Sequence, residues 1–265
     1  MMTTLIWTLR YEALMAARSK AVWAAVLPLA LLGLLLAATS PVVTGQSDPA
    51  ARCGAAAVLV NTLCTLGVGL ALTDRLRRTV EARGMPELLT ATPTGQLPRT
   101  TGALLGPLLT ALAPVVALFL LYGAVISATA GSAAPLASAA VALAVAVLPA
   151  ALLVTAFAGL LGVLMPVAAA RAVTTAVWLW ALHFPPRFSP LPTATGTVLS
   201  PLGGYPLVAW AHVPEVWARR QGTGPLRPAV TDATALLNLA LVLATAAACY
   251  GLGHLVARLR PHGAS

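Results

Sequence analysis

Long apolar runs separated by short polar segments form the main pattern of this chain. Four of these runs, 21–39, 53–73, 100–170 and 233–257, contain no Asp, Glu, Lys or Arg. Each is long enough for a helix that crosses a bilayer, which needs about 20 apolar residues. The apolar residues are continuous, whereas the strands of a membrane β-barrel show short alternating stretches. The pattern therefore predicts an all-α membrane protein.

The longest run must contain more than one span. It covers residues 100–170, and its stretch of small and polar residues at 127–135 is the natural place for a turn. Arg171 lies near the start of a further apolar segment, close enough to its end for the guanidinium to reach the membrane interface. The chain is thus predicted to form a single transmembrane domain, 1–265, with six spans. These spans are 21–39, 54–73, 102–126, 136–160, 167–184 and 233–257.

The arginines indicate the orientation of the spans. If the N-terminus lies inside, 11 of the 16 basic residues fall in inner segments, and the outer segment 185–232 holds four of the other five. Cytoplasmic loops of membrane proteins carry an excess of Lys and Arg. The sequence therefore predicts that both termini are cytoplasmic. The inner basic residues are Arg10, Arg18, Lys20, Arg75, Arg77, Arg78, Arg83, Arg99, Arg171, Arg258 and Arg260.

Two further segments have the pattern of surface or interfacial helices. In residues 4–20, Ile6, Leu9, Ala13 and Ala16 would share one side, which suits an amphipathic helix in the inner interface. The outer segment 185–232 holds nine of the 21 prolines. Within it Leu207, Trp210, Ala211 and Trp217 would form a membrane-facing side. A simple surface cap is compatible with this stretch.

Composition agrees with a membrane protein. The chain has 265 residues, of which 59% are hydrophobic and 9% are charged, compared with about 25% charged residues in a soluble domain. The formal net charge of +9 is explained by basic residues that flank the spans and meet anionic lipid. Membrane lipid is therefore an expected partner, and nucleic acid is not.

The inner loop between the second and third spans, 74–99, holds an unusual concentration of charge. Its first part reads DRLRRTVEARGMPELLTATPTG and contains seven charged residues. The pattern predicts a helix to about Ala82 and a second, short helix after Gly84, with Leu88 and Leu89 on an apolar face. One interpretation is a solvated loop whose arginines only fix the topology. The other is a docking element for a cytoplasmic partner, since an apolar face with a charged rim suits such contacts.

This loop resembles the first cytoplasmic loop of the permease subunits of type-two ABC exporters. The resemblance rests on Glu81, Arg83, Gly84, Glu87, Leu88, Leu89 and Pro93 in this order. It extends to the amphipathic N-terminal helix, the six spans and the long outer segment. The family often has Gly-Lys at the start of the third span, where this chain has Gly102 and Ala103.

The resemblance implies that the loop is a coupling helix seated on a separate ABC ATPase subunit. Its contact residues would be Glu81, Arg83, Gly84, Glu87, Leu88 and Leu89. It also implies a dimer with a second permease copy or a paralogue, and short re-entrant helices that close the outer end of the pathway. The expected function is export driven by ATP.

The chain itself lacks the P-loop residues that bind ATP. A phosphate-binding P-loop has a glycine-rich turn followed by Lys, and the only lysine, Lys20, stands in the sequence SKAV. We therefore expect no cofactor in this chain, and ATP and Mg in the partner ATPase. No enzyme motif is found, the cysteines and histidines have no metal-ligand spacing, and neither a catalytic nor a metal site is predicted. Asn61, in the second span, would hydrogen-bond between helices or line a pathway.

Two other classes of function remain as alternatives. An ion-coupled secondary transporter usually carries acidic or histidine relays in its spans, yet every Asp and Glu lies at or outside a predicted span end. A membrane-embedded enzyme has less support, because no nucleophile, base or metal set appears. The alanine content and 15 Arg against one Lys indicate a GC-rich bacterial genome, and hence the bacterial inner membrane. By resemblance, the cargo would be an antibiotic or a peptide.

Overall fold

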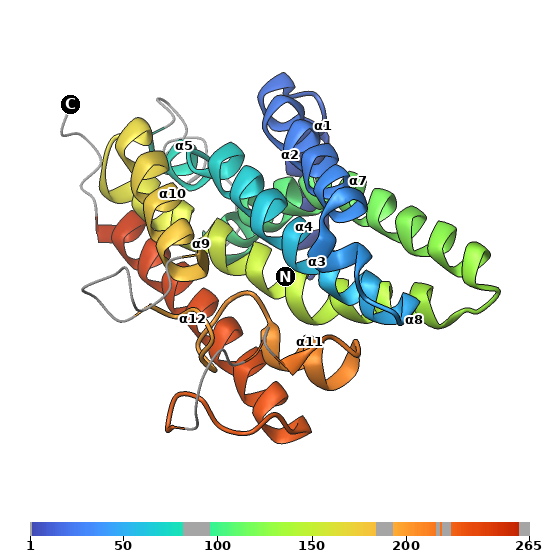
Figure 1. Ribbon diagram of the computed structural model, residues 1–265. Helices are drawn as coiled ribbons and strands as arrows, with labels where there is room; N and C mark the ends of the chain where they lie inside the picture. Colours follow the sequence, from blue (N-terminus) through green and yellow to red (C-terminus); the bar gives the residue numbers. More distant parts are fainter. Residues whose placement is uncertain (1, 82–95, 184–192, 216–217, 219–223, 260–265) are drawn as a thin grey trace.

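The fold is entirely helical over the residues that the computed structural model describes, which are 2–81, 96–183, 193–215, 218 and 224–259. No strand occurs in these ranges, so the predicted all-α class is confirmed. The first half contains α1 (Met2–Ala17), α2 (Lys20–Thr39), α3 (Pro41–Thr44), α4 (Pro49–Leu72) and α5 (Arg75–Glu81). The second half contains α7 (Gln96–Ala130), α8 (Ala134–Ala142), η1 (Leu143–Val147), α9 (Leu148–Leu164), α10 (Val167–His183), α11 (Gly204–Trp210) and α12 (Asp232–Leu259). Figure 1 shows their arrangement.

Five helical stretches in the described part of the chain are long and apolar enough to cross a membrane. They are Lys20–Thr39, Pro49–Arg78, Leu97–Ala130, Ala134–Leu164 and Asp232–Ala257. The fifth predicted span, 167–184, corresponds to α10, which has 17 residues. At 1.5 Å per residue it is about 25 Å long, less than the roughly 30 Å of a hydrocarbon core. The prediction ran to residue 184, which lies outside the described residues.

Helix α4 forms the centre of the bundle. It packs against α2, α7, α8, α9 and α10, and 78% of its apolar stretch is buried. Its small residues permit this close packing. A Cβ at Gly67 would lie 2.9 Å from the carbonyl oxygen of Ala25, and one at Gly69 would lie 2.9 Å from a methyl carbon of Val154. In contrast, only 28% of the apolar stretch of α2 and 22% of that of α12 are buried, so both present wide apolar faces outward.

Helix α1 lies along α7, and two glycines of α7 make the contact. A Cβ at Gly102 would lie 2.6 Å from a side-chain carbon of Thr8, and a Cβ at Gly106 would lie 2.6 Å from the Leu9 carbonyl oxygen. The packed side of α1 thus includes Thr8 and Leu9. The predicted apolar side is packed at Leu9 and Ala13, which Gly106 approaches, and at Ala16, which is fully buried. Ile6, predicted on the same side, is 56% exposed, so the prediction was wrong for Ile6.

The hairpin between α7 and α8 turns at Gly131, whose φ is +63°. This position favours glycine, because a Cβ strains a left-handed backbone. Helix α7 runs to Ala130, longer than the predicted third span. The following span contains the π-helical segment η1 just before Pro149. Proline lacks the N–H that would bond to the carbonyl group four residues earlier, and a local π-helical turn accommodates that loss.

Candidate functional site

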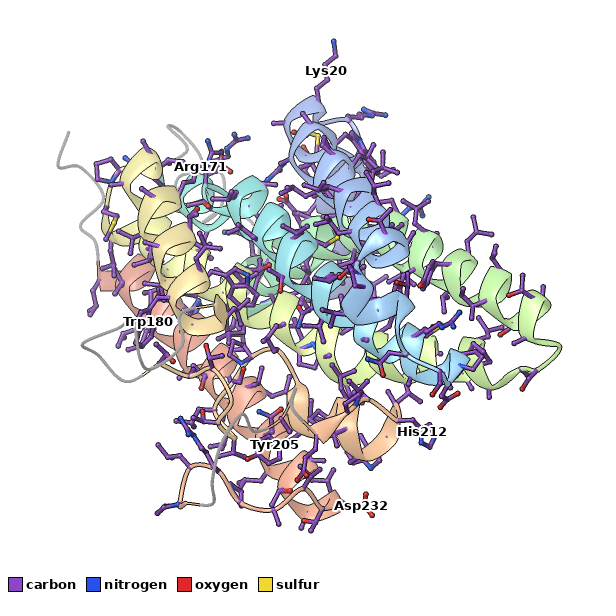
Figure 2. The ribbon with its side chains drawn as sticks, in the orientation of Figure 1. Lys20, Arg171, Trp180, Tyr205, His212 and Asp232 are labelled. Carbon is purple, nitrogen blue, oxygen red and sulfur yellow. The ribbon has the colours of Figure 1, made fainter. Side chains whose placement is uncertain are left out.

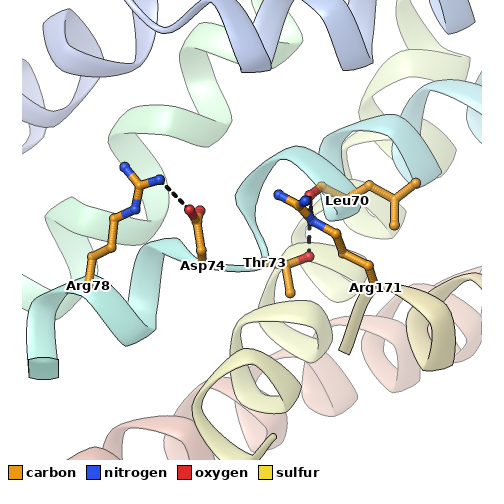
Figure 3. Close-up of polar contacts among 5 residues, drawn as sticks. All are labelled: Leu70, Thr73, Asp74, Arg78 and Arg171. Atoms are coloured by element: carbon orange, nitrogen blue, oxygen red, sulfur yellow. Dashed lines mark hydrogen bonds and ion pairs between the residues drawn. The ribbon is translucent and has the colours of Figure 1, made fainter. Parts of the chain in front are cut away.

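The charged loop begins at a short turn where α4 ends. Thr73 and Asp74 separate α4 from α5. The Thr73 hydroxyl donates to the carbonyl oxygen of Gly69 at 2.7 Å, and Asp74 forms an ion pair with Arg78, one turn further along α5 (Figure 3). The Thr73 hydroxyl thus satisfies a carbonyl group in the last turn of α4, where helical partners are missing. Consequently α4 and α5 form a bent unit that carries the chain from the bundle into the loop.

Helix α10 contacts the same helix end through Arg171. The Nε of Arg171 donates to the carbonyl oxygen of Leu70 at 3.1 Å (Figure 3). This oxygen belongs to the last turn of α4, where carbonyl groups lack helical partners and a positive charge is favourable. Further along the same pair of helices, away from the charged loop, the Trp178 indole donates to the Thr62 carbonyl oxygen at 3.0 Å. Two side chains of α10 are thus hydrogen-bonded to the backbone of α4.

Helix α5 is anchored by Leu76, which is only 2% exposed. Its side chain lies against Gly159 of α9 and Gly253 of α12. A Cβ at Gly253 would be 2.9 Å from Leu76 Cδ2. A Cβ at Gly162 of α9 would be 2.0 Å from the carbonyl oxygen of Thr73. The first part of the loop therefore sits directly on α9 and α12.

Most of the predicted partner-contact residues lie outside the residues that the structure describes. Glu81 is the last residue of α5. Arg83, Gly84, Glu87, Leu88 and Leu89 lie outside the described residues, and so does the predicted second helix of the loop. Their role remains a prediction. The sequence analysis did not identify Leu76 as an anchor, although its position within a run of arginines, RLRR, was a usable signal for an inward-facing residue.

Asn61 lies in the interior of the bundle and is fully buried. Its Nδ2 donates to the carbonyl oxygens of Pro201 and Leu202, at 3.3 and 3.4 Å. A second buried asparagine, Asn238 of α12, donates from Nδ2 to the carbonyl oxygens of Val198 and Ser200, at 2.6 and 3.0 Å. Two spans thus hold the segment 198–202 between them. The sequence analysis expected a hydrogen bond from Asn61 but did not single out Asn238.

The segment before α11 is buried despite its polar sequence. Thr195, Thr197 and Ser200 are each at most 5% exposed. Gly203 has a φ of +69°, and a Cβ there would lie 2.8 Å from the Cβ of Ala146. Segment 193–203 therefore enters the bundle, as a re-entrant stretch would. We call it the buried loop.

Helix α11 packs against protein on the side that was predicted to face the membrane. Leu207 and Ala211 are fully buried, and a Cβ at Gly54 of α4 would lie 2.7 Å from the Ala211 carbonyl oxygen. Trp210 donates from its indole N–H to an Asp232 carboxylate oxygen at 2.8 Å. The predicted membrane-facing side was therefore wrong for Leu207 and Ala211. Trp217 lies outside the described residues.

The amide oxygens of Asn61 and Asn238 have no hydrogen-bond partner among the described residues, and both are buried. Each is an acceptor available to a buried water molecule. In the described ranges, no group of three or more His, Cys, Asp or Glu side chains could hold a metal ion. The polar chemistry of the interior is therefore that of hydroxyl, amide and carbonyl groups.

Two features occupy opposite ends of the bundle. One is the charged turn at Thr73 and Asp74, and the other is the buried loop. Lys20 and Arg171 lie at the upper side in Figure 2, whereas His212 and Asp232, which follow the buried loop and α11 in the chain, lie at the lower side. Helix α4 connects the two features, because it carries Asn61 in its interior and ends at the charged turn. Comparison of the chain with protein-family models, with curated proteins and with solved structures finds no match.

Proposed function

We propose that the chain is the membrane-spanning permease subunit of an ATP-driven exporter of the type-two ABC kind. A separate ATPase subunit binds the loop 74–99, hydrolyses ATP with Mg, and moves the permease. The chain supplies the translocation pathway together with a second permease copy or a paralogue. It resides in the bacterial inner membrane with both termini in the cytoplasm.

The observation that carries this proposal is the way α5 is joined to the bundle. Leu76 is buried between α9 and α12, Thr73 abuts Gly162, and Arg171 ties α10 to the end of α4. A force applied to the loop would therefore act on four helices together. A loop that only fixed topology would not require this packing. Rigid movement of packed helices is a common way of switching a membrane pathway between two states.

The buried loop is the corresponding candidate for the opposite end of the pathway. In this proposal Asn61 and Asn238 hold segment 198–202 closed, and their release opens the route for cargo. Helix α10 serves as a short sixth span, and α1 lies in the inner interface beside α7. The cargo is apolar or amphipathic, such as an antibiotic or a peptide, since the interior presents mainly apolar side chains.

The proposal is tested by purifying the protein with its ATPase. The chain is isolated from native membranes in mild detergent, and the associated ATPase is identified and assayed. Both proteins are then reconstituted into vesicles. The double substitution Glu87→Ala and Leu88→Ala should abolish ATP-dependent transport or the association itself, because it removes the acidic rim and the apolar contact of the proposed coupling helix.

A matched control changes one acidic residue and one leucine at the opposite end of the bundle. Glu215→Ala with Leu199→Ala alters two exposed residues and should leave the association with the ATPase unchanged. Normal binding and transport in the Glu87 and Leu88 variant would contradict the proposal. Transport by the chain alone, driven by a proton gradient in vesicles without ATPase, would support the alternative of an ion-coupled secondary transporter.

A further inference from the structure

A pocket of about 230 Å³ lies between α7, α9 and α12. Its walls include Leu104 and Leu105 from α7, Leu152 from α9, and Leu243 and Ala246 from α12. All three helices belong to stretches long and apolar enough to cross a membrane. The pocket thus lies within the spanning part of the bundle.

The pocket exists because two helices are joined at one end and separated by small residues further along. Helices α7 and α12 both pack on α9. At the end near the charged loop, Tyr250 of α12 is hydrogen-bonded to Thr101 and Thr100 of α7, at 2.8 and 3.0 Å between hydroxyl oxygens. Alanines at 156 and 246 then line the space between the helices. Side chains of this size leave it unfilled.

The two hydroxyl groups in the lining lie at one end and are paired with each other. Thr101 and Tyr250 line the pocket, and beyond them the Nδ1 of His254 lies 3.2 Å from the Thr100 hydroxyl oxygen. Arg99 directly precedes this cluster in the chain. The pocket therefore has an apolar interior and a polar, basic end on the side of the charged loop.

Size and polarity indicate the kind of ligand. A cavity of about 150 Å³ lined by apolar side chains stays dry and accepts a small hydrocarbon, so this larger apolar pocket is better filled by hydrocarbon than by water. It is smaller than the roughly 300–1,000 Å³ pockets that hold drug-sized molecules. Leu243, on its wall, is 40% exposed on the outer face of α12, where acyl chains surround a spanning helix.

We infer that this pocket binds the part of one acyl chain that lies nearest the headgroup of a membrane phospholipid. The phospholipid belongs to the leaflet on the side of the charged loop, and its headgroup lies at the polar end beside Thr101 and Tyr250. The bound chain fills the space between α7 and α12 and so supports the packing of α12 on α9. The inference does not depend on the proposed export function.

The test uses the full chain in vesicles of phosphatidylethanolamine and phosphatidylglycerol with a trace of a photoactivatable phospholipid. This probe carries a diazirine on one acyl chain, a few carbon atoms from the ester group. After irradiation, mass spectrometry locates the labelled residues. Leu104 and Ala156 are 7% and 4% exposed, so lipid outside the pocket does not reach them. Label on these two residues is the expected result, and its absence would overturn the inference.

Two variants fill the pocket and should remove that label. Ala156→Leu and Ala246→Phe each add a side chain to the lined space, whereas label on the exposed Leu31 and Leu35 of α2 should persist. The control Ala248→Phe enlarges an exposed residue of α12 that does not line the pocket. Undiminished label on Leu104 in a folded, filled variant would also overturn the inference. If neither variant folds, the pattern in the unaltered protein decides the question.

Discussion

The Nε of Arg171 lies 3.1 Å from the main-chain oxygen of Leu70, so a side chain of α10 caps the end of α4. The two residues are 101 positions apart in the sequence. Their contact joins the start of the charged loop to a helix that does not directly precede or follow it. The cap is exposed to solvent on the arginine side, which limits its contribution to stability.

Replacement of Arg171 tests this cap. Arg171→Ala should lower the free energy of unfolding by about 1 kcal/mol, the net value of one hydrogen bond. Arg171→Lys keeps the positive charge near the helix end but loses the Nε donor, so it should recover only part of the stability. Thermal unfolding in detergent, followed by circular dichroism, measures both. Arg18→Ala, at another exposed arginine, serves as the control, and an equal effect of all three changes would refute the cap.

Gly106 should tolerate no side chain, because α1 lies too close. A Cβ at this position would be 2.6 Å from the Leu9 carbonyl oxygen and 2.9 Å from the Ala13 nitrogen, and backbone atoms cannot move aside separately. Gly106→Ala should therefore destabilise the protein by about 1–3 kcal/mol, as overpacking does. Limited proteolysis would report release of α1 from α7.

Gly251 provides the matched control for this prediction. It lies in α12, and a Cβ there would have no neighbour within 4 Å. Gly251→Ala should stabilise the helix by about 0.5–1 kcal/mol, since glycine loses more backbone entropy than alanine on folding. If both substitutions had the same sign, the close approach of α1 and α7 would be wrong.

The buried loop should depend on both of its asparagines. Asn61→Leu leaves the carbonyl groups of Pro201 and Leu202 without their donor, and the loss should be about 1–3 kcal/mol. Asn238→Leu should have a similar effect through Val198 and Ser200. Because both hold one segment, the double variant should lose less than the sum of the single variants. Thermal unfolding of the three proteins forms the double-mutant cycle, and strict additivity would show that the two contacts are independent.

Because Glu12 is partly buried, we expect the stability of the folded protein to depend on pH. It lies on α1 beside Gly106, and burial raises the pKa of its carboxyl group, while Arg75 and Arg78 partly oppose the shift. A raised pKa means that the folded protein holds the proton more tightly than the unfolded chain. The stability from Glu12 is therefore present below the unfolded pKa and is lost as pH rises through the folded pKa.

Glu12→Gln removes this titration without changing the size of the side chain. The variant should be more stable than the native protein at neutral pH, and its stability should change less between about pH 4 and pH 8. Thermal unfolding across this range measures the difference. A native profile identical to that of the Glu12 variant would contradict the prediction.

Much of the fold could be predicted because the hydropathy of the sequence marks the spans. Continuous apolar runs and the absence of water in the bilayer force helices, and the all-helical fold follows. The bounds of α10, Val167–His183, agree with the predicted span 167–184 over the described residues. The exposure of Ile6 was not predictable, because Gly102 and Gly106 of a different helix decide which side of α1 is covered.

The candidate site could be predicted only in part, for a different physical reason. The concentration of charge in 74–99 is local and visible in the sequence. The anchor Leu76 and the cap from Arg171 depend on residues brought together from distant positions. Asn61 was noticed because a polar residue is conspicuous in an apolar span, and Asn238, in the span 233–257, gave the same signal. That both side chains bind segment 198–202 could not be predicted, because this segment returns into the bundle only through tertiary contacts. Contacts with a loop of irregular backbone leave no periodic signal.

The position of the buried loop also sets an order for biosynthesis. Its backbone receives hydrogen bonds from α4 through Asn61 and from α12 through Asn238. The ribosome makes α12 after the loop, so the loop has only half of these partners until residue 238 has been added. The loop therefore docks fully only after α12 is made, and a nascent chain stopped before residue 238 retains a loop held from one side alone.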